Sequence, residues 1–281
     1  MGLFDGWVVI FSDGSRAMRA IRIGYEASPQ DGSFAAMRES WIQAEAMGAD
    51  AVYNDDHFFP VESDPDGLHF EAWTSLAALA EATSRVEIGV LVTCMSYRNP
   101  NLLADMARTV DHISGGRLVL GIGSGWFEKD YAEFGYEFGT AITRLHAFRD
   151  AIPVIKDRMA VGNPPPVRGK IPIMIGGGGE KVMLKLVAQH ADIWHGFGTP
   201  DEYRHKCEVL DAHCATVGRD PAEIERSVMF EAHELGDDAF FEAYVDAGAT
   251  CFFYSAAGPD YSLAGLQQLL DWRAQRSQSS R

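Results

Sequence analysis

Eight short runs of apolar residues recur along the chain, and each is followed by a stretch whose apolar residues have helical spacing. In the first such stretch, Phe34, Met37 and Trp41 lie three and four residues apart. Runs that are apolar on both faces are typical of strands in a parallel sheet covered by helices. Eight consecutive strand-then-helix units therefore predict an α/β fold of the (β/α)8 TIM-barrel type. The expected strands are residues 21–25, 51–54, 86–92, 118–122, 171–175, 193–197, 227–231 and 251–255, and the expected helices are 34–47, 71–83, 99–113, 143–158, 180–189, 200–217, 238–247 and 263–276.

One domain accounts for the length of 281 residues, because α/β barrels commonly reach roughly 200 to 250 residues as a single unit. We expect the barrel to span residues 20–276, with a C-terminal tail at 277–281. Residues 1–19 are expected to be an N-terminal tail or upstream extension, with Met18 as an alternative first residue. The longest connection, 123–170, contains the segment NPPPVRGK and is expected to pass over the mouth of the barrel.

Charge and composition exclude several classes of function. The formal net charge of −16 argues against nucleic-acid binding, which depends on Lys and Arg neutralising phosphates. No run approaches the roughly 20 apolar residues of a membrane helix, and four cysteines without a secretion signal indicate reduced thiols in a cytoplasm. Cys207, Cys214, His205 and His213 lack the CxxC or HxxxH spacing of a metal site, so no metal is expected.

The segment LVLGIGSGWFE, at residues 118–128, contains glycines in a pattern close to that of a dinucleotide-binding loop. Gly121 and Gly123 fit the G-x-G-x-x-G pattern, but Trp126 occupies the position of the third glycine. We therefore interpret the loop as a place for close backbone approach to a flat or anionic ligand, and not as a site for a dinucleotide pyrophosphate.

A second glycine run, IMIGGGGEK at residues 173–181, ends an expected strand and opens a helix. Successive backbone N–H groups at a helix N-terminus, with Lys181 in the first turn, favour an anion such as phosphate. A plain tight turn is the alternative, because glycine suits any left-handed backbone.

Side chains that follow the strands should line the active-site end of a TIM barrel. Histidines and aromatic residues there suit a planar ring and proton transfer near neutral pH. The residues in these positions are Glu26, Asp55, Asp56, His57, Thr93, Ser124, Trp126, His195, Glu231, His233 and Tyr254.

Four segments resemble motifs of the luciferase-like flavin and deazaflavin oxidoreductases, particularly the branch dependent on coenzyme F420 (8-hydroxy-5-deazaflavin). They are NDDHFFP at 54–60 and the longer segments 70–93, 114–138 and 172–194. The resemblance covers residues 21–272 and implies a luciferase-like barrel with deazaflavin in its mouth. It also implies a non-proline cis peptide near Val90 and Leu91. The cofactor-binding residues implied by the resemblance are Asp56, Val90, Leu91, Thr93, Ser124, Gly125, Lys129, Gly178, Gly179, Lys181 and Val182.

The sequence departs from the related sugar-phosphate dehydrogenases where those enzymes hold their substrate. Trp126 replaces their catalytic glutamate, and Phe197 and Pro200 replace the threonine and lysine that grip the sugar phosphate. Glucose 6-phosphate is therefore not the expected substrate, and Trp126, Phe127 and Phe197 indicate a more apolar small molecule.

The expected reaction is hydride transfer between deazaflavin and an organic substrate. His57 is the expected proton donor or acceptor, and Asp56 is expected to contact the ring or orient the imidazole. His195 is a second candidate, with a hydrogen-bonded structural histidine as the alternative. Glu231 and Tyr254 are expected to help fix the substrate.

Two other functions are compatible with the same residues. One is FMN-dependent monooxygenation on the same fold, and the other is a non-catalytic barrel that carries or senses a flavin-like ligand. Lys129 and Lys181 favour deazaflavin over FMN, because its acidic tail needs cations in a protein this negative. The family resemblance suggests a homodimer.

Overall fold

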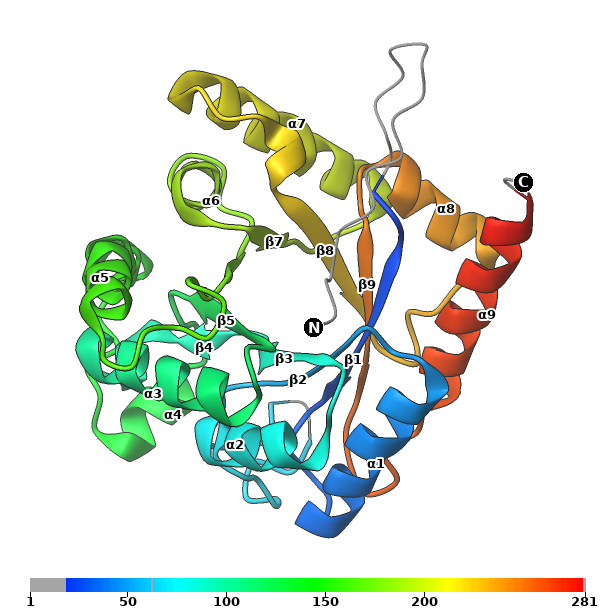
Figure 1. The fold of residues 1–281 in the computed structure, drawn as a ribbon, viewed down its shortest axis with the longest axis horizontal. Coiled ribbons are helices and arrows are strands. Elements are labelled where there is room, and N and C mark those ends of the chain that lie inside the picture. The colour runs from blue at the N-terminus through cyan, green and yellow to red at the C-terminus, as the bar shows by residue number, and fades with distance from the viewer. Residues whose placement is uncertain (1–18, 62, 280–281) are drawn as a thin grey trace.

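The computed structural model of the chain describes residues 19–61 and 63–279, which form a closed barrel of parallel strands with helices around the outside (Figure 1). The predicted (β/α)8 TIM barrel is thereby confirmed. The strand order is β3-β2-β1-β9-β8-β7-β6-β5-β4, and pairing of β3 with β5 closes the ring. The strands are β1 (Arg22–Ala27), β2 (Ala51–Asn54), β3 (Glu87–Val90), β4 (Thr93–Cys94), β5 (Leu118–Gly123), β6 (Ile173–Gly176), β7 (Ile193–His195), β8 (Glu225–Phe230) and β9 (Cys251–Ala256).

The third predicted strand is divided in the structure. β3 and β4 both pair with β5 and are separated by Leu91 and Val92. The peptide bond between these two residues is cis, one bond later than the position that the family resemblance implied. The interruption brings Leu91 to the wall of the cavity described below.

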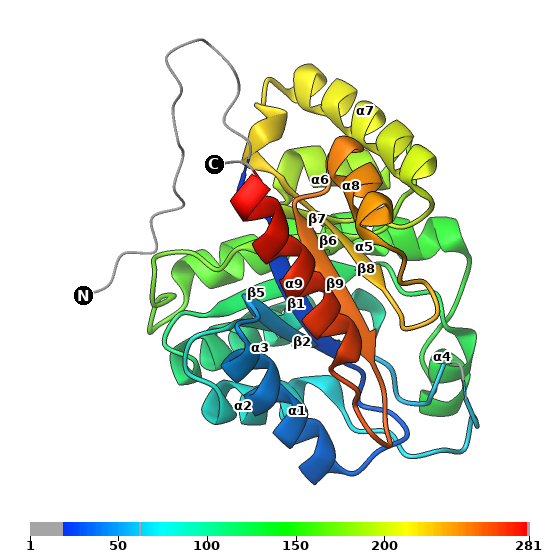
Figure 2. The same ribbon diagram turned by 90° about the vertical axis from the view of Figure 1, so that its right-hand side faces the viewer.

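The helices cover the outer face of the barrel, and α9 runs along β1 and β9 (Figure 2). In the described part of the chain, no helix is both long and apolar enough to cross a bilayer. The helices are α1 (Phe34–Met47), α2 (Ala72–Ala82), α3 (Pro100–Ile113), α4 (Glu128–Phe134), α5 (Ala141–Val161), α6 (Met183–His190), α7 (Pro200–Val217), α8 (Asp238–Asp246) and α9 (Ala264–Ser279), with short 3₁₀ turns at Met95–Tyr97 and Pro221–Glu223.

Described residues extend slightly beyond both ends of the expected barrel range. α9 continues to Ser279, three residues beyond the expected end at 276. The guanidinium of Arg19, expected in the N-terminal tail, donates to the carbonyls of Ala222 and Glu223. The rest of that tail, including Met18, lies outside the described residues.

The connection 123–170 does not lie over the mouth as a whole. Its first part forms α4, which the sequence did not predict. The proline-rich part lies instead at the end of α3, where Arg108 and His112 contact the carbonyls of Pro164 and Pro165. That end of α3 leads into the start of β5, on the face opposite the mouth.

Glycines in the strands make room for the interior of the barrel. A Cβ atom on Gly24 would lie 2.3 Å from Cε1 of Phe253, and a Cβ atom on Gly121 would lie 2.0 Å from the carbonyl oxygen of Val90. A Cβ atom on Gly123 would similarly meet Val92 at 2.8 Å. At Gly121 and Gly123, where the sequence predicted close approach of a ligand, the neighbouring segment 90–92 of the same chain makes the close approach.

Candidate functional site

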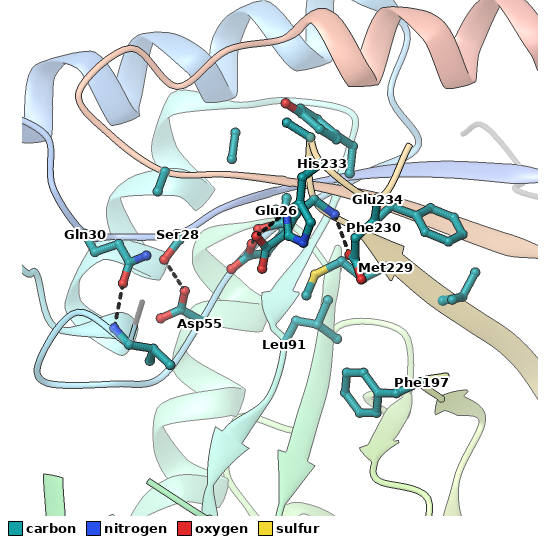
Figure 3. Close-up of a pocket in the computed structure, with 18 of the residues that line it drawn as sticks. Glu26, Ser28, Gln30, Asp55, Leu91, Phe197, Met229, Phe230, His233 and Glu234 are labelled. Atoms are coloured by element: carbon teal, nitrogen blue, oxygen red, sulfur yellow. Dashed lines mark hydrogen bonds and ion pairs between the residues drawn. The ribbon is translucent and has the colours of Figure 1, made fainter. Parts of the chain in front are cut away.

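A cavity of about 1090 Å³ opens at the carboxyl ends of β1, β2, β7, β8 and β9. In Figure 3, Ser28 and Asp55 are seen toward one end of the cavity and Phe197 toward the other, with Glu26 and Met229 between them. This is the end of a TIM barrel at which active sites lie. The residues predicted from the sequence that line it are Glu26, Asp55, His57, Leu91, Trp126, Phe197, Glu231, His233 and Tyr254.

The imidazole of His57 is held at the cavity wall by Asp130. Its Nδ1 atom lies 2.8 Å from Oδ2 of Asp130, a fully buried carboxylate on α4. Oδ2 also accepts from the hydroxyl of Tyr97 at 2.9 Å, and Oδ1 accepts from the backbone N–H of Phe58 at 3.1 Å. Asp130 therefore fixes a proton on Nδ1 and leaves Nε2 as the atom that can exchange a proton with a ligand.

The pKa of His57 is raised above its ordinary value. Burial disfavours the charged imidazolium, but the hydrogen bond to Asp130 and the negative charges of Asp55, Asp130 and Asp56 outweigh that effect. Aromatic rings enclose the imidazole, since those of Trp126 and Phe127 meet it edge to face at centroid distances of 5.7 and 5.3 Å. The result is an imidazole that can carry a proton near neutral pH.

Asp56 does not orient the imidazole of His57, which was one of the two roles expected for it. Its carboxylate is buried and accepts from Nη1 and Nη2 of Arg98, at 2.6 and 2.9 Å, and from the backbone N–H of Cys94 at 2.9 Å. Arg98 also donates to Glu71, at the start of α2. Asp56 therefore joins the loop after β2 to the segment after β4, and the residue that orients the imidazole is Asp130.

A pair of carboxyl groups, Glu26 and Asp55, lines the same cavity as His57, and Figure 3 shows both side chains. The hydroxyl of Ser255 donates to Glu26, and that of Ser28 donates to Asp55. Burial raises the pKa of Glu26 well above its usual range, and the nearby charges of Asp55 and Glu231 raise it further. Burial and these charges therefore favour the protonated form of Glu26, whose carboxyl group lines the same cavity as the imidazole.

His195 is a residue of the barrel interior and does not line the cavity. It is 1% exposed, its Nδ1 lies 2.9 Å from Oγ of Ser227, and its Nε2 has no hydrogen-bond partner among the described residues. Its ring packs edge to face on Phe197 and Phe253. Burial lowers the pKa of His195 to about 3, so the structural alternative for this histidine is the one that the geometry favours.

Acid should destabilise the protein through His195. Its pKa is about 3 when folded and roughly 6.5 when unfolded. The unfolded chain therefore gains a proton as the pH falls below 6.5, while the folded protein does not. We expect a loss of about 2 kcal/mol in the free energy of unfolding between pH 8 and pH 5 from this group alone.

Urea titrations of the protein and of His195→Asn at both pH values measure this loss. The His195→Asn variant keeps a polar atom near Ser227, and its loss of stability between pH 8 and pH 5 should be smaller by about 2 kcal/mol. His146→Asn, at an exposed site on α5, is the control and should lose as much stability as the unchanged protein. An equal loss in His195→Asn and the unchanged protein would contradict the assignment.

The glycine loop after β6 provides an open cradle next to the start of α6. Gly177 has a φ of +134°, and a Cβ atom on Gly178 would meet nothing closer than Cε of Lys206 at 3.8 Å. Lys206 comes from α7 and lies 2.5 Å from Glu180, so the loop has a lysine that the sequence did not indicate. Lys181 is exposed at the same place, and Val182 is the N-cap residue of α6.

The other residues implied for the cofactor lie in three different environments. Val90 and Thr93 are buried, and Oγ1 of Thr93 accepts from Nε1 of Trp73. Ser124 and Gly125 follow β5, and Gly125 has a φ of +76° that a side chain rarely adopts. Lys129 lies over the ring of Phe59, at 4.2 Å from its centroid, so it is on the side of the mouth next to β2.

The chain resembles known proteins in sequence. A family model described as luciferase-like monooxygenase matches residues 19–279. An F420-dependent glucose-6-phosphate dehydrogenase from Amycolatopsis mediterranei is 33% identical over 141 residues, 49% of this chain and 41% of that protein. A phthiodiolone/phenolphthiodiolone dimycocerosates ketoreductase from Mycobacterium bovis is 29% identical over 226 residues, 66% of this chain and 58% of that protein. The chain thus spans less than two thirds of the length of these curated relatives.

Solved structures share the fold at low sequence identity. An F420-dependent secondary alcohol dehydrogenase in complex with an F420-acetone adduct has a TM-score of 0.78 at 18% identity, covering 90% of this chain and 98% of the other. An FMN complex of the oxygenating constituent of a diketocamphane monooxygenase from Pseudomonas putida has a TM-score of 0.61 at 17% identity, covering 76% and 68%.

Proposed function

Because this chain belongs to the luciferase-like monooxygenase family, we propose that it is an F420-dependent oxidoreductase that transfers a hydride between the coenzyme and a small organic substrate. The observation that carries the proposal is the His57 imidazole, which Asp130 holds at the wall of a cavity of about 1090 Å³. Relatives named as F420-dependent enzymes support the choice of coenzyme.

The residues present fit a coenzyme with a flat ring and a phosphate. Gly178 and Gly179 leave open space at the start of α6, and Lys181 and Lys206 supply positive charge beside them. Backbone N–H groups at such a helix start favour an anion. Leu91, at the interruption between β3 and β4, offers an apolar surface for the ring.

Each side chain of the cavity has a separate role in the proposed reaction. The coenzyme, when bound, supplies the hydride donor or acceptor. His57 exchanges a proton at Nε2, with Asp130 holding Nδ1. Trp126 and Phe197 bound the space for an apolar substrate, and Glu231 and Tyr254 line it. Burial favours the protonated form of Glu26, which lines the same cavity.

FMN-dependent monooxygenation remains the second candidate, because an FMN enzyme shares the fold. Monooxygenation would use FMN in place of F420. A carrier or sensor would bind a flavin-like ligand without turnover.

We also propose that the protein forms a homodimer. Exposed apolar side chains on two neighbouring helices are available for such an interface. They are Leu102 and Ile113 on α3, and Val154 and Val161 on α5.

A fluorescence titration of the protein with oxidised F420, beside FMN and NADP, tests the proposed function. Saturable quenching by F420 alone at micromolar concentrations is the expected result. Lys181→Gln should weaken F420 binding about tenfold, which is the loss expected for one hydrogen bond to a charged group. Lys185→Gln, an exposed lysine on α6, is the matched control and should bind F420 unchanged. Binding of FMN without F420 would overturn the proposal.

A further inference from the structure

The cavity at the mouth of the barrel has an unusually one-sided charge. Among the described residues that line it there is no lysine or arginine, and His57 and His233 are its only histidines. Charges of one sign in a concave site raise the local concentration of ligands of the opposite sign. The carboxyl groups that line the cavity belong to Glu26, Asp55, Glu202, Glu231, Glu234 and Asp260.

Large aromatic rings border the same cavity and are open to solvent. Trp126 is 63% exposed and Phe197 is 55% exposed, although both are large apolar side chains. The rings of Tyr244 and Tyr254 also line the cavity but are buried. Exposed rings at the edge of a cavity indicate a surface that a ligand covers, and the faces of such rings attract cations.

We propose that the substrate of this site is an organic cation, with a positively charged nitrogen attached to an apolar body. The inference rests on the proposed function for the identity of the site and adds the class of substrate. The carboxylates attract the charge, and Trp126 and Phe197 contact the apolar body or the charged nitrogen. An anionic substrate would meet repulsion from several carboxylates without a lysine or arginine among the described lining residues to offset it.

Glu26 gives this inference a signature that does not depend on turnover. The groups that face its carboxyl are Asp55 after β2, Glu231 after β8 and Ser255 on β9, and the two carboxylates favour its protonated form. A cation placed against Glu26 and Asp55 would favour the ionised form instead. Binding of a cation should therefore release a proton from the protein.

Isothermal titration calorimetry with three small probes tests the inference on the full chain. The probes are benzyltrimethylammonium, 2-phenylethanol and phenylacetate, which are similar in size and carry a positive, no and a negative charge. We expect the Kd of benzyltrimethylammonium to be at least about tenfold lower than that of either other probe. The heat should also change between buffers of different ionisation enthalpy, because a proton is released. Equal binding of all three probes, or tighter binding of phenylacetate, would overturn the inference.

Two variants assign the preference to the carboxyl pair. Glu26→Gln and Asp55→Asn keep the size of each side chain and should reduce the preference for the cation at least several-fold, and Glu26→Gln should also abolish proton release. Glu208→Gln, at an exposed carboxylate on α7, is the matched control and should retain both properties. Circular dichroism and thermal unfolding show whether each variant is folded. A folded Glu26→Gln, Asp55→Asn double variant with an unchanged preference would contradict the inference.

The same protein sample, titrated with F420, separates the two proposals. F420 binding without a preference for the cation would overturn the substrate class and leave the proposed function standing. Preference for the cation without F420 binding would overturn the proposed function and support the charge selectivity of the cavity.

Discussion

Replacing His57 with asparagine should slow hydride transfer between F420 and its substrate by about 100-fold or more, the usual size of general acid–base catalysis. The amide of asparagine can still donate to Asp130, so the local structure should persist, but the exchangeable Nε2 atom is lost. Stopped-flow measurement of the coenzyme absorbance in a single turnover gives this rate directly. A rate within about threefold of the unchanged protein would show that the imidazole takes no part in acid–base catalysis, whose usual contribution is far larger.

Asp130 acts through His57, and its variants should have a different signature. Asp130→Asn removes the charge that helps to raise the pKa of His57, so the pH at which the rate depends on the imidazole should move downward. Tyr97→Phe removes only the hydroxyl that donates to Asp130 and should leave the pH profile nearly in place. A shift of equal size in both variants would indicate general disturbance of the loop and not the charge of Asp130.

The fold could be predicted because each unit of the barrel carries its own local signal. Apolar strands and amphipathic helices are encoded within a few neighbouring residues, and eight repetitions reinforce one another. α4 was missed because its seven residues have little local signal. It depends on packing between distant segments, as in the stacking of Phe58 on Phe134 at 3.9 Å between ring centroids.

The candidate site could be predicted where the position after a strand determines the environment. That rule brought His57, Glu231 and Tyr254 to one cavity. It could not identify Asp130, which lies 73 residues from His57 in sequence and is brought to it only by the folded loop after β5. It also could not show that Arg98, 42 residues after Asp56, occupies the carboxylate that seemed free for catalysis.

Arg98→Met should destabilise the protein by about 3 to 5 kcal/mol, the usual cost of breaking a buried ion pair by removing one partner. Asp56 would keep the N–H of Cys94 but lose both guanidinium hydrogen bonds. Chemical denaturation measures the effect. The matched control is Arg149→Met, because Arg149 also pairs with an aspartate, Asp150, but at an exposed position, where solvent screens the pair and its loss should change stability little.

The structural assignment of Asp56 is tested by adding Asp56→Asn to this variant. If the two side chains stabilise the fold through each other, the double variant should cost less than the sum of the single variants by about 1 kcal/mol or more. Asp56→Asn alone should transfer hydride at close to the unchanged rate when measured at a temperature where it is folded, because Asp56 touches neither the cavity nor the imidazole in the described structure. A folded Asp56→Asn protein that loses about 100-fold in rate would restore the catalytic role, since a loss of that size is the mark of acid–base chemistry. Substitution of Asp56 should therefore change the stability of the protein, whereas substitution of Asp130 should change the rate of hydride transfer.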